Sequence, residues 1–121
     1  MLQFLYRDYR MSHQNRIKKA VIISFSGKVT EADYQDYCKE LNNEIEKNHD
    51  SYIFLIKKVP DLSAYALKLL YAFSNTSTRK TGLLIKNPGY TMLESFKLED
   101  RFIMSKDIKS ILKQLEQSGP S

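Results

Sequence analysis

The sequence predicts a single α/β domain with a mixed β-sheet and the element order β-β-α-β-α-β-α-β-α. Short runs rich in β-branched and aromatic residues alternate with longer stretches whose apolar residues recur at helical spacing. The first two runs are separated only by a polar turn, which indicates an antiparallel hairpin at the N-terminus. The later strands are separated by helices, which implies right-handed crossovers and parallel pairing, with the helices mainly covering one face of the sheet.

Five segments have the character of strands. The first alternates apolar and polar residues, whereas the fourth is apolar throughout, which suits burial on both faces. The second ends at Gly27, a position where a side chain is expected to be unwelcome. The predicted strands are Leu2–Arg10, Lys19–Ser26, Tyr52–Lys57, Thr81–Lys86 and Arg101–Met104.

The first predicted helix has the clearest start. Thr30 is a good N-cap, and Glu31 and Asp33 place acids in the first turn, where the helix dipole favours them. One face of this helix is apolar, and Cys38 lies on it as a small core residue rather than a reactive thiol. The apolar stripe consists of Tyr34, Tyr37, Cys38, Leu41 and Ile45. The residues expected to face away from the core are Glu40, Asn43, Glu44 and Lys47.

Three further helices are expected. One runs from Ser63 to Phe73, because Pro60 breaks the preceding strand and Ser63 can cap a helix. A short one spans Tyr90–Leu98, and the last is capped by Ser105 and has Ile108, Ile111, Leu112 and Leu115 as its core face. We expect one domain over residues 1–117 and a disordered tail over residues 118–121.

The composition is that of an ordinary soluble globular domain. The chain has 121 residues, of which 42% are hydrophobic and 27% are charged, so it is long enough to bury one core. No apolar run is long enough to cross a bilayer, and the N-terminus lacks the features of a secretory signal. The one cysteine excludes an internal disulfide. A reducing, cytoplasmic location is therefore expected.

Charge and motifs disfavour several functions. The net charge of +5 suits an anionic partner, but the lysines are spread along the chain without a stacking-aromatic pattern, so a nucleic-acid role is not favoured. His13 and His49 lie in segments with no evident reason to meet, and the chain has no nucleophile motif and no metal-spaced pair of His or Cys. The sequence therefore predicts no enzyme, no metal site and no cofactor.

Several segments together resemble the STAS domain, the fold of SpoIIAA-type anti-sigma-factor antagonists. The first is Ser26-Gly27-Lys28-Val29, at the end of the hairpin. The second is the buried strand that runs into the helix at Ser63. The third is Leu93–Phe102, which is similar to the family's short helix, loop and aromatic residue before the last strand. The resemblance covers essentially the whole chain. The segment Gly27–Tyr34 also resembles the related lipid-binding group.

The resemblance implies a partner-switching regulator. In such families a serine kinase that doubles as an anti-sigma factor docks on the domain and phosphorylates a serine at the start of the second helix. Here the ungapped match puts Ser63 in the position of the family's aspartate and Ala64 in that of its phosphoserine. The Asp-Ser pair is absent, so the usual switch is expected to be lost. Ser63 is then either the helix N-cap or a phosphorylation site shifted by one residue.

The favoured hypothesis is a regulatory module that binds a protein, of the serine kinase, anti-sigma factor or phosphatase type. The residues expected to contact this partner are Gly27, Lys28, Ser63, Ala64, Tyr65 and Lys68, and Tyr71 is a further candidate. The alternative is a STAS domain that holds an anionic ligand (a nucleotide, phosphate or lipid) at the free amides of the helix at Ser63, near Lys28, Lys57 and Lys58. The sequence leaves a homo-oligomer open.

Overall fold

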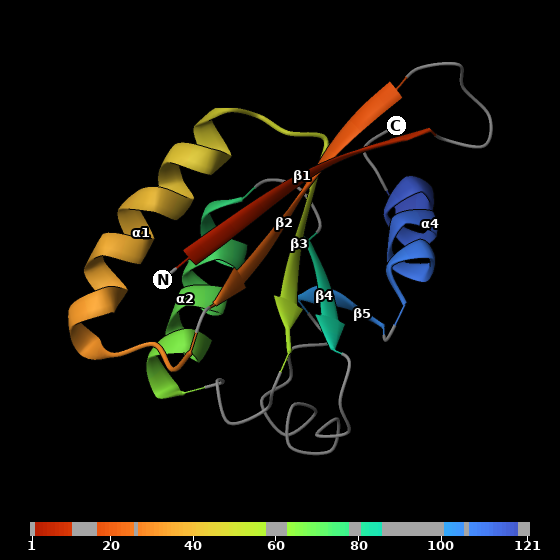
Figure 1. The fold of residues 1–121 in the computed structure, drawn as a ribbon. Coiled ribbons are helices and arrows are strands. Elements are labelled where there is room, and N and C mark those ends of the chain that lie inside the picture. The colour runs from red at the N-terminus through yellow and green to blue at the C-terminus, as the bar shows by residue number, and fades with distance from the viewer. Residues whose placement is uncertain are drawn as a thin grey trace.

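The sheet has five strands that stand in chain order, β1-β2-β3-β4-β5. The structure is a computed structural model that describes residues 2–10, 17–25, 27–57, 63–77, 81–85, 101–105 and 107–118. β1 runs antiparallel to β2, and the other neighbouring strands are parallel. The strand bounds are β1 (Leu2–Arg10), β2 (Ile17–Phe25), β3 (Ser51–Ile56), β4 (Thr81–Ile85) and β5 (Phe102–Ser105). The predicted hairpin and mixed sheet are therefore confirmed (Figure 1).

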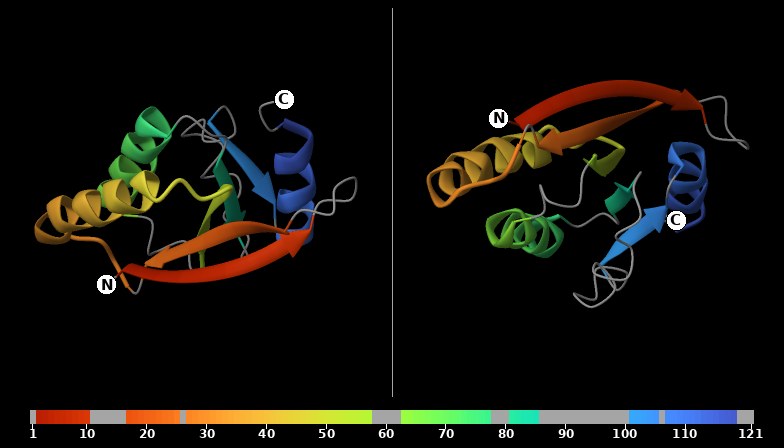
Figure 2. Two further views of the ribbon diagram at one scale, coloured as in Figure 1. Left: turned by 90° about the horizontal axis from the view of Figure 1, so that it is seen from above. Right: turned by 60° about the horizontal axis from the view of Figure 1, so that its bottom comes forward.

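Helices cover both faces of the sheet. α1 (Glu31–Glu46) and α2 (Ala64–Thr76) lie on one face, as expected, and α4 (Ile108–Ser118) lies on the other (Figure 2). The predicted helix Tyr90–Leu98 lies outside the described residues. The predicted tail begins at Ser118, which is the last residue of α4, and its remaining residues are not among those described.

Each face of the sheet carries its own core. The larger core joins the sheet to α1 and α2, and at its centre the ring of Phe54 meets that of Phe73 edge-on, with centroids 4.9 Å apart. The smaller core packs Ile111 of α4 against Ile53 and its neighbours. A side chain at Gly82 would collide with the Cγ2 methyl of Ile111, so this glycine allows α4 to pack closely on β4.

The helix starts match the sequence analysis at two of three positions. Thr30 caps α1, and it forms a capping box with Asp33. Ser63 caps α2. The prediction that Ser105 caps the last helix is wrong, because the Asp107 side chain accepts the backbone N–H of Lys109 at 3.2 Å. Ser105 is the last residue of β5, and its hydroxyl accepts the N–H of Asp107 at 3.2 Å in the turn between the two elements.

Candidate docking surface

Ser63 fixes the start of α2 to the loop that precedes α1. Its backbone is extended, with φ −72° and ψ 171°, and its hydroxyl accepts the N–H of Ala66 at 3.2 Å. The same hydroxyl donates to the backbone oxygen of Val29 at 2.7 Å. Ser63 is half-buried. The hydroxyl of Ser63 thus both donates and accepts a hydrogen bond within the protein, which confirms its structural role as an N-cap.

The bond from Ser63 to Val29 brings two other predicted contact residues to this point. Gly27 and Lys28 directly precede Val29, and both are exposed whereas Val29 is buried. Gly27 has φ +86°, in the left-handed region that favours glycine. The turn that contains Gly27 and Lys28 is therefore held next to the start of α2 through the bond to Val29.

Tyr65 and Lys68 form the adjoining part of this surface. The Nζ atom of Lys68 lies 5.1 Å from the centroid of the Tyr65 ring, a cation–π arrangement. The ring also lies near that of Tyr34 in α1, with centroids 6.1 Å apart. Lys68 is exposed and Tyr65 is half-buried. Burial raises the pKa of the Tyr65 hydroxyl, and the nearby Glu31 carboxylate raises it further. Tyr34 was assigned to the core stripe, so its place at this edge was missed.

We call these six residues the α2-start surface. The structure places all of them around one helix start. The α2-start surface consists of Gly27, Lys28, Ser63, Ala64, Tyr65 and Lys68. Of the other two lysines expected near a captured ligand, Lys57 is exposed directly after β3, and Lys58 lies outside the described residues.

Tyr71 belongs to a separate cluster farther along α2. The guanidinium carbon of Arg101 lies 5.1 Å from the centroid of the Tyr71 ring. The same guanidinium donates to Asn75 Oδ1 at 2.6 Å and to Ser74 Oγ at 3.1 Å. Arg101 directly precedes β5, so this cluster joins the end of α2 to the edge of the sheet that β5 forms.

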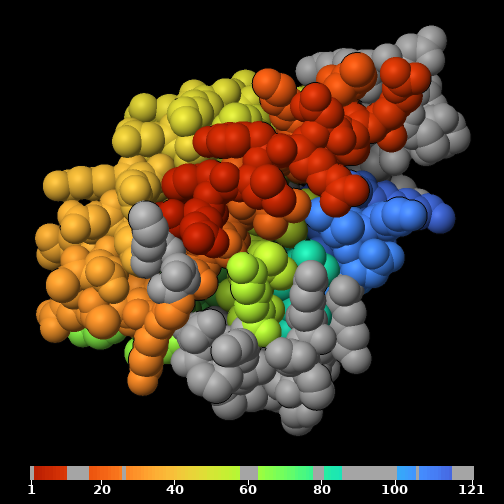
Figure 3. Space-filling view, viewed as in Figure 1, coloured from red at the N-terminus to blue at the C-terminus, as the bar shows by residue number. Residues whose placement is uncertain are grey.

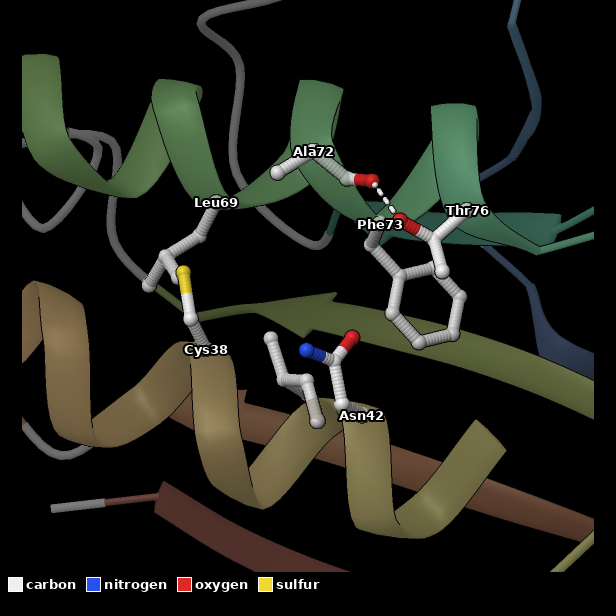
Figure 4. Close-up of a pocket in the computed structure, with 7 residues that line it drawn as sticks. Cys38, Asn42, Leu69, Ala72, Phe73 and Thr76 are labelled. Atoms are coloured by element: carbon white, nitrogen blue, oxygen red, sulfur yellow. Dashed lines mark hydrogen bonds between the residues drawn. The ribbon is translucent and has the colours of Figure 1, made fainter. Parts of the chain in front are cut away.

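A small cavity opens between α1 and α2. Its volume is about 90 Å³, and the Cys38 side chain points into it (Figure 4). Sites for nucleotide-sized ligands usually measure some 300–1,000 Å³, so this cavity is too small for one. Cys38 is half-buried and packs against the larger core, as predicted. The lining residues are Cys38, Leu41, Asn42, Leu69, Ala72, Phe73 and Thr76.

A buried carboxylate lies at the other end of α1, where sequence reasoning expected a solvated one. The side chain of Glu44 is only 5% exposed, so the prediction that it faces away from the core is wrong. Its Oε1 accepts Tyr6 Oη at 2.8 Å and Lys47 Nζ at 2.7 Å, and its Oε2 lies 3.0 Å from His49 Nε2. Tyr52 completes the cluster, because its hydroxyl donates to the Glu44 backbone oxygen at 2.7 Å and accepts the His49 N–H at 3.0 Å.

Hydrogen bonding decides the charge of Glu44. Burial raises the pKa of this carboxyl, but hydrogen bonds from Lys47, Tyr6 and His49 outweigh burial and lower the pKa below its ordinary value. Glu44 is therefore ionised at neutral pH. Within the described part of the chain, no group of three His, Cys, Asp or Glu side chains is placed to hold a metal ion.

Comparison with known proteins supplies one informative likeness. No protein family's sequence profile matches the chain, and no curated protein matches it. The crystal structure of an anti-sigma factor antagonist from Mycobacterium paratuberculosis matches 95% of this chain and 94% of its own, with a TM-score of 0.71 and 14% identity. The chain has the fold of an anti-sigma factor antagonist. The STAS-like fold predicted from the sequence is thereby confirmed.

The likeness to the anti-sigma factor antagonist extends over almost the whole chain. At 14% identity it establishes the fold and not the contacts of any site. Among the described helices, none is both long enough and apolar enough to cross a membrane.

Proposed function

We propose that this chain is a non-enzymatic regulatory protein that binds a protein partner of the anti-sigma-factor or serine-kinase type through the α2-start surface. The observation that carries this proposal is the whole-chain likeness to the anti-sigma factor antagonist, with a TM-score of 0.71. The exposed Lys28 and Lys68 support it, because they flank a helix start that Ser63 anchors to the fold. A contact built on a rigid element loses little conformational entropy on binding.

We further propose that docking is not switched off by phosphorylation. Ala64, which the sequence match puts in the phosphoserine position, is exposed but has no hydroxyl. Ser63 has a hydroxyl, but it is bonded to Val29 and Ala66 and only half exposed. Transfer of a phosphoryl group to Ser63 would replace the proton that Ser63 donates to Val29 and so break the bond that anchors the helix start. The partner would therefore stay bound in the presence of ATP.

The docking surface is tested with a purified serine-kinase or anti-sigma-type protein from the same genome. Calorimetry measures its affinity for the wild type and for Tyr65→Glu, Lys68→Glu and Ser63→Ala. We expect the two charge-changing variants to bind at least tenfold more weakly, because each disrupts the Tyr65–Lys68 contact and changes the charge of the surface. Ser63→Ala should bind as the wild type does, because the Ser63 hydroxyl is bonded to Val29 and Ala66 within the protein and makes no contact that a partner needs.

Lys109→Glu is the matched control. Lys109 is an exposed lysine of α4, on the opposite face of the sheet, and its substitution changes the net charge as Lys68→Glu does. If all four variants bind with the affinity of the wild type, the α2-start surface is not the docking site. If Lys109→Glu weakens binding as much as Lys68→Glu, overall charge rather than this surface determines affinity.

The missing switch is tested by intact-mass measurement after incubation with the same kinase-type partner, ATP and Mg²⁺. We expect the wild type to gain no phosphate, and Ala64→Ser to gain one because it restores a hydroxyl in the family's position. A phosphate on the wild type that disappears in Ser63→Ala would instead assign the switch to Ser63.

A further inference from the structure

We propose that β1 binds an extended acidic segment of a protein, which pairs with its open edge and adds a sixth strand to the sheet. β1 is the first strand in the sheet order, and in the described part of the chain its ladder partner is β2 alone. Six of its nine residues are exposed. Figure 3 shows β1 running uncovered across the front of the molecule. This edge is separate from the α2-start surface, and the inference does not depend on the proposed function.

The main chain of β1 is suited to accept a strand. It is paired with β2 along its whole length, from Leu2 opposite Phe25 to Arg10 opposite Ile17, so its backbone is already extended. Its sequence holds no proline and no glycine, the residues that usually interrupt an edge. Its outward N–H and C=O groups are the template that strand addition uses.

Exposed apolar side chains flank this edge on both faces of the sheet. In the described residues the large exposed hydrophobic side chains are Leu5 (62%), Tyr6 (47%) and Ile17 (57%), all on the hairpin. Leu5 and Tyr6 are consecutive in β1, so they lie on opposite faces. A flat partner resting on one face would contact only one of them. An added strand contacts both, because its own side chains alternate in the same way.

The buried Glu44 cluster holds the middle of this edge in place. The Tyr6 hydroxyl is hydrogen-bonded to the Glu44 carboxylate at 2.8 Å, and Lys47 Nζ lies 5.8 Å from the centroid of the Tyr6 ring. The aromatic ring is thus oriented before any partner arrives. Such preorganisation reduces the entropy lost on binding.

Charge determines the chemistry of the partner. Arg7 and Arg10 are exposed on β1 with only Asp8 between them as an acid, and the exposed Lys47 lies beside the edge. An antiparallel segment would therefore place acids opposite Arg7 and Arg10, a base opposite Asp8 and apolar residues opposite Tyr6 and Leu5. Read from its N-terminus, such a segment has the pattern acid, any residue, base, acid, apolar, apolar.

A second copy of the chain fits this edge less well. Two β1 strands related by a twofold axis perpendicular to the sheet pair in antiparallel fashion, and opposite residues then share a face. Asp8 is the one acid in β1, and it lies on the other face from Arg7. Twofold pairing can therefore never place a carboxylate opposite Arg7, and one register places Arg7 opposite itself.

The test uses two synthetic peptides with blocked ends. One contains Glu-Thr-Lys-Glu-Val-Ile, and the other, with the charges inverted, contains Lys-Thr-Glu-Lys-Val-Ile. We expect only the first to bind, and we expect it to slow hydrogen exchange of the β1 amides and not of the α2 amides. Arg7→Glu should weaken its binding at least tenfold. The variant should in turn bind a peptide with lysine opposite position 7, Glu-Thr-Lys-Lys-Val-Ile, more tightly than the wild type does.

Lys39→Glu is the matched control, because Lys39 is an exposed lysine of α1 away from this edge. Equal losses in Arg7→Glu and Lys39→Glu would overturn the proposal, as would a bound peptide that leaves the β1 amides unprotected. A third outcome would also overturn it: sedimentation that shows a dimer without peptide, with the β1 amides already protected from exchange. That outcome would assign the edge to a second copy of the chain. Tyr65→Glu should bind the peptide normally, so failure of this inference and failure of the proposed docking surface are distinguishable.

Discussion

Glu44 shows how a charged side chain is accommodated in a small α/β protein. Its carboxylate is removed from water but is bonded to Tyr6, Lys47 and His49, which come from a strand, a helix end and a loop. Buried charges are tolerated when their hydrogen-bonding capacity is met in this way. In the described residues every buried side-chain nitrogen and oxygen has a partner. The cluster ties the edge strand to α1.

This cluster predicts a pH dependence of stability. The pKa of Glu44 is lower in the folded protein than in the unfolded chain, so its contribution is fully present above the unfolded pKa and is lost as the pH falls through the folded one. Glu44→Gln should lower the free energy of unfolding by about 1–3 kcal/mol at pH 7. Urea denaturation of both proteins between about pH 3 and pH 7 measures this difference, which should shrink below about pH 4. An equal difference at both extremes would contradict the assignment.

The burial of Glu44 could be predicted from its position in the helical repeat of α1. It follows Tyr37 by seven residues and Leu41 by three, which places it in phase with the apolar stripe of α1. Its assignment to the solvent side followed residue type instead of helical phase. Its partners Tyr6 and His49 come from distant segments, and no local pattern indicates that they meet it. Ser63 was predicted correctly because an N-cap depends on sequence neighbours only.

Whole elements were more predictable than their packing. All five strands and the starts of α1 and α2 follow from apolar periodicity and caps within a few residues. The position of α4 on the opposite face of the sheet from α1 and α2 could not be read from its own stripe, because an amphipathic pattern says only that one side is buried. The cap of α4 was placed two residues early because Ser105 and Asp107 both suit the role.

The close approach of Ile111 to Gly82 predicts an energetic coupling between α4 and β4. Gly82→Ala would place a methyl group against Ile111, so we expect it to lower the free energy of unfolding by about 1–3 kcal/mol through overpacking. The loss should be smaller in an Ile111→Ala background, because the colliding methyl is then absent. A double-mutant cycle by chemical denaturation measures this coupling. Strictly additive losses would show that the contact does not limit the packing.

At the scale of the molecule, the two proposed surfaces are separate. The α2-start surface is built on α2 and the loop before α1, whereas the β1 edge is the outermost strand of the sheet (Figure 2). The hairpin was predicted from the sequence, but the exposure of Leu5 and Tyr6 depends on which elements cover β1. The partner class was already implied by the resemblance of the sequence to STAS domains, and the structure adds a fold likeness over 95% of the chain.

This separation predicts that both surfaces bind at once. The affinity for the acidic peptide should be unchanged, within about twofold, when a kinase- or anti-sigma-type partner already occupies the protein, because neither site uses a residue of the other. Titration of the peptide into the preformed complex of the protein with its partner measures this affinity. Displacement of the partner by the peptide would show that the two surfaces overlap or are coupled.

The chain order of the strands also bears on how the protein is made. Each strand from β2 to β5 joins beside its predecessor, so a chain leaving the ribosome never has to insert a strand between two that are already paired. The face beneath α1 and α2 can be covered first, as soon as both helices have emerged. The other face stays uncovered until α4, the last described helix, has been made, and its apolar residues include Ile22, Ile53 and Leu84. During synthesis, that apolar face is the one that stays open to chaperones or to neighbouring chains.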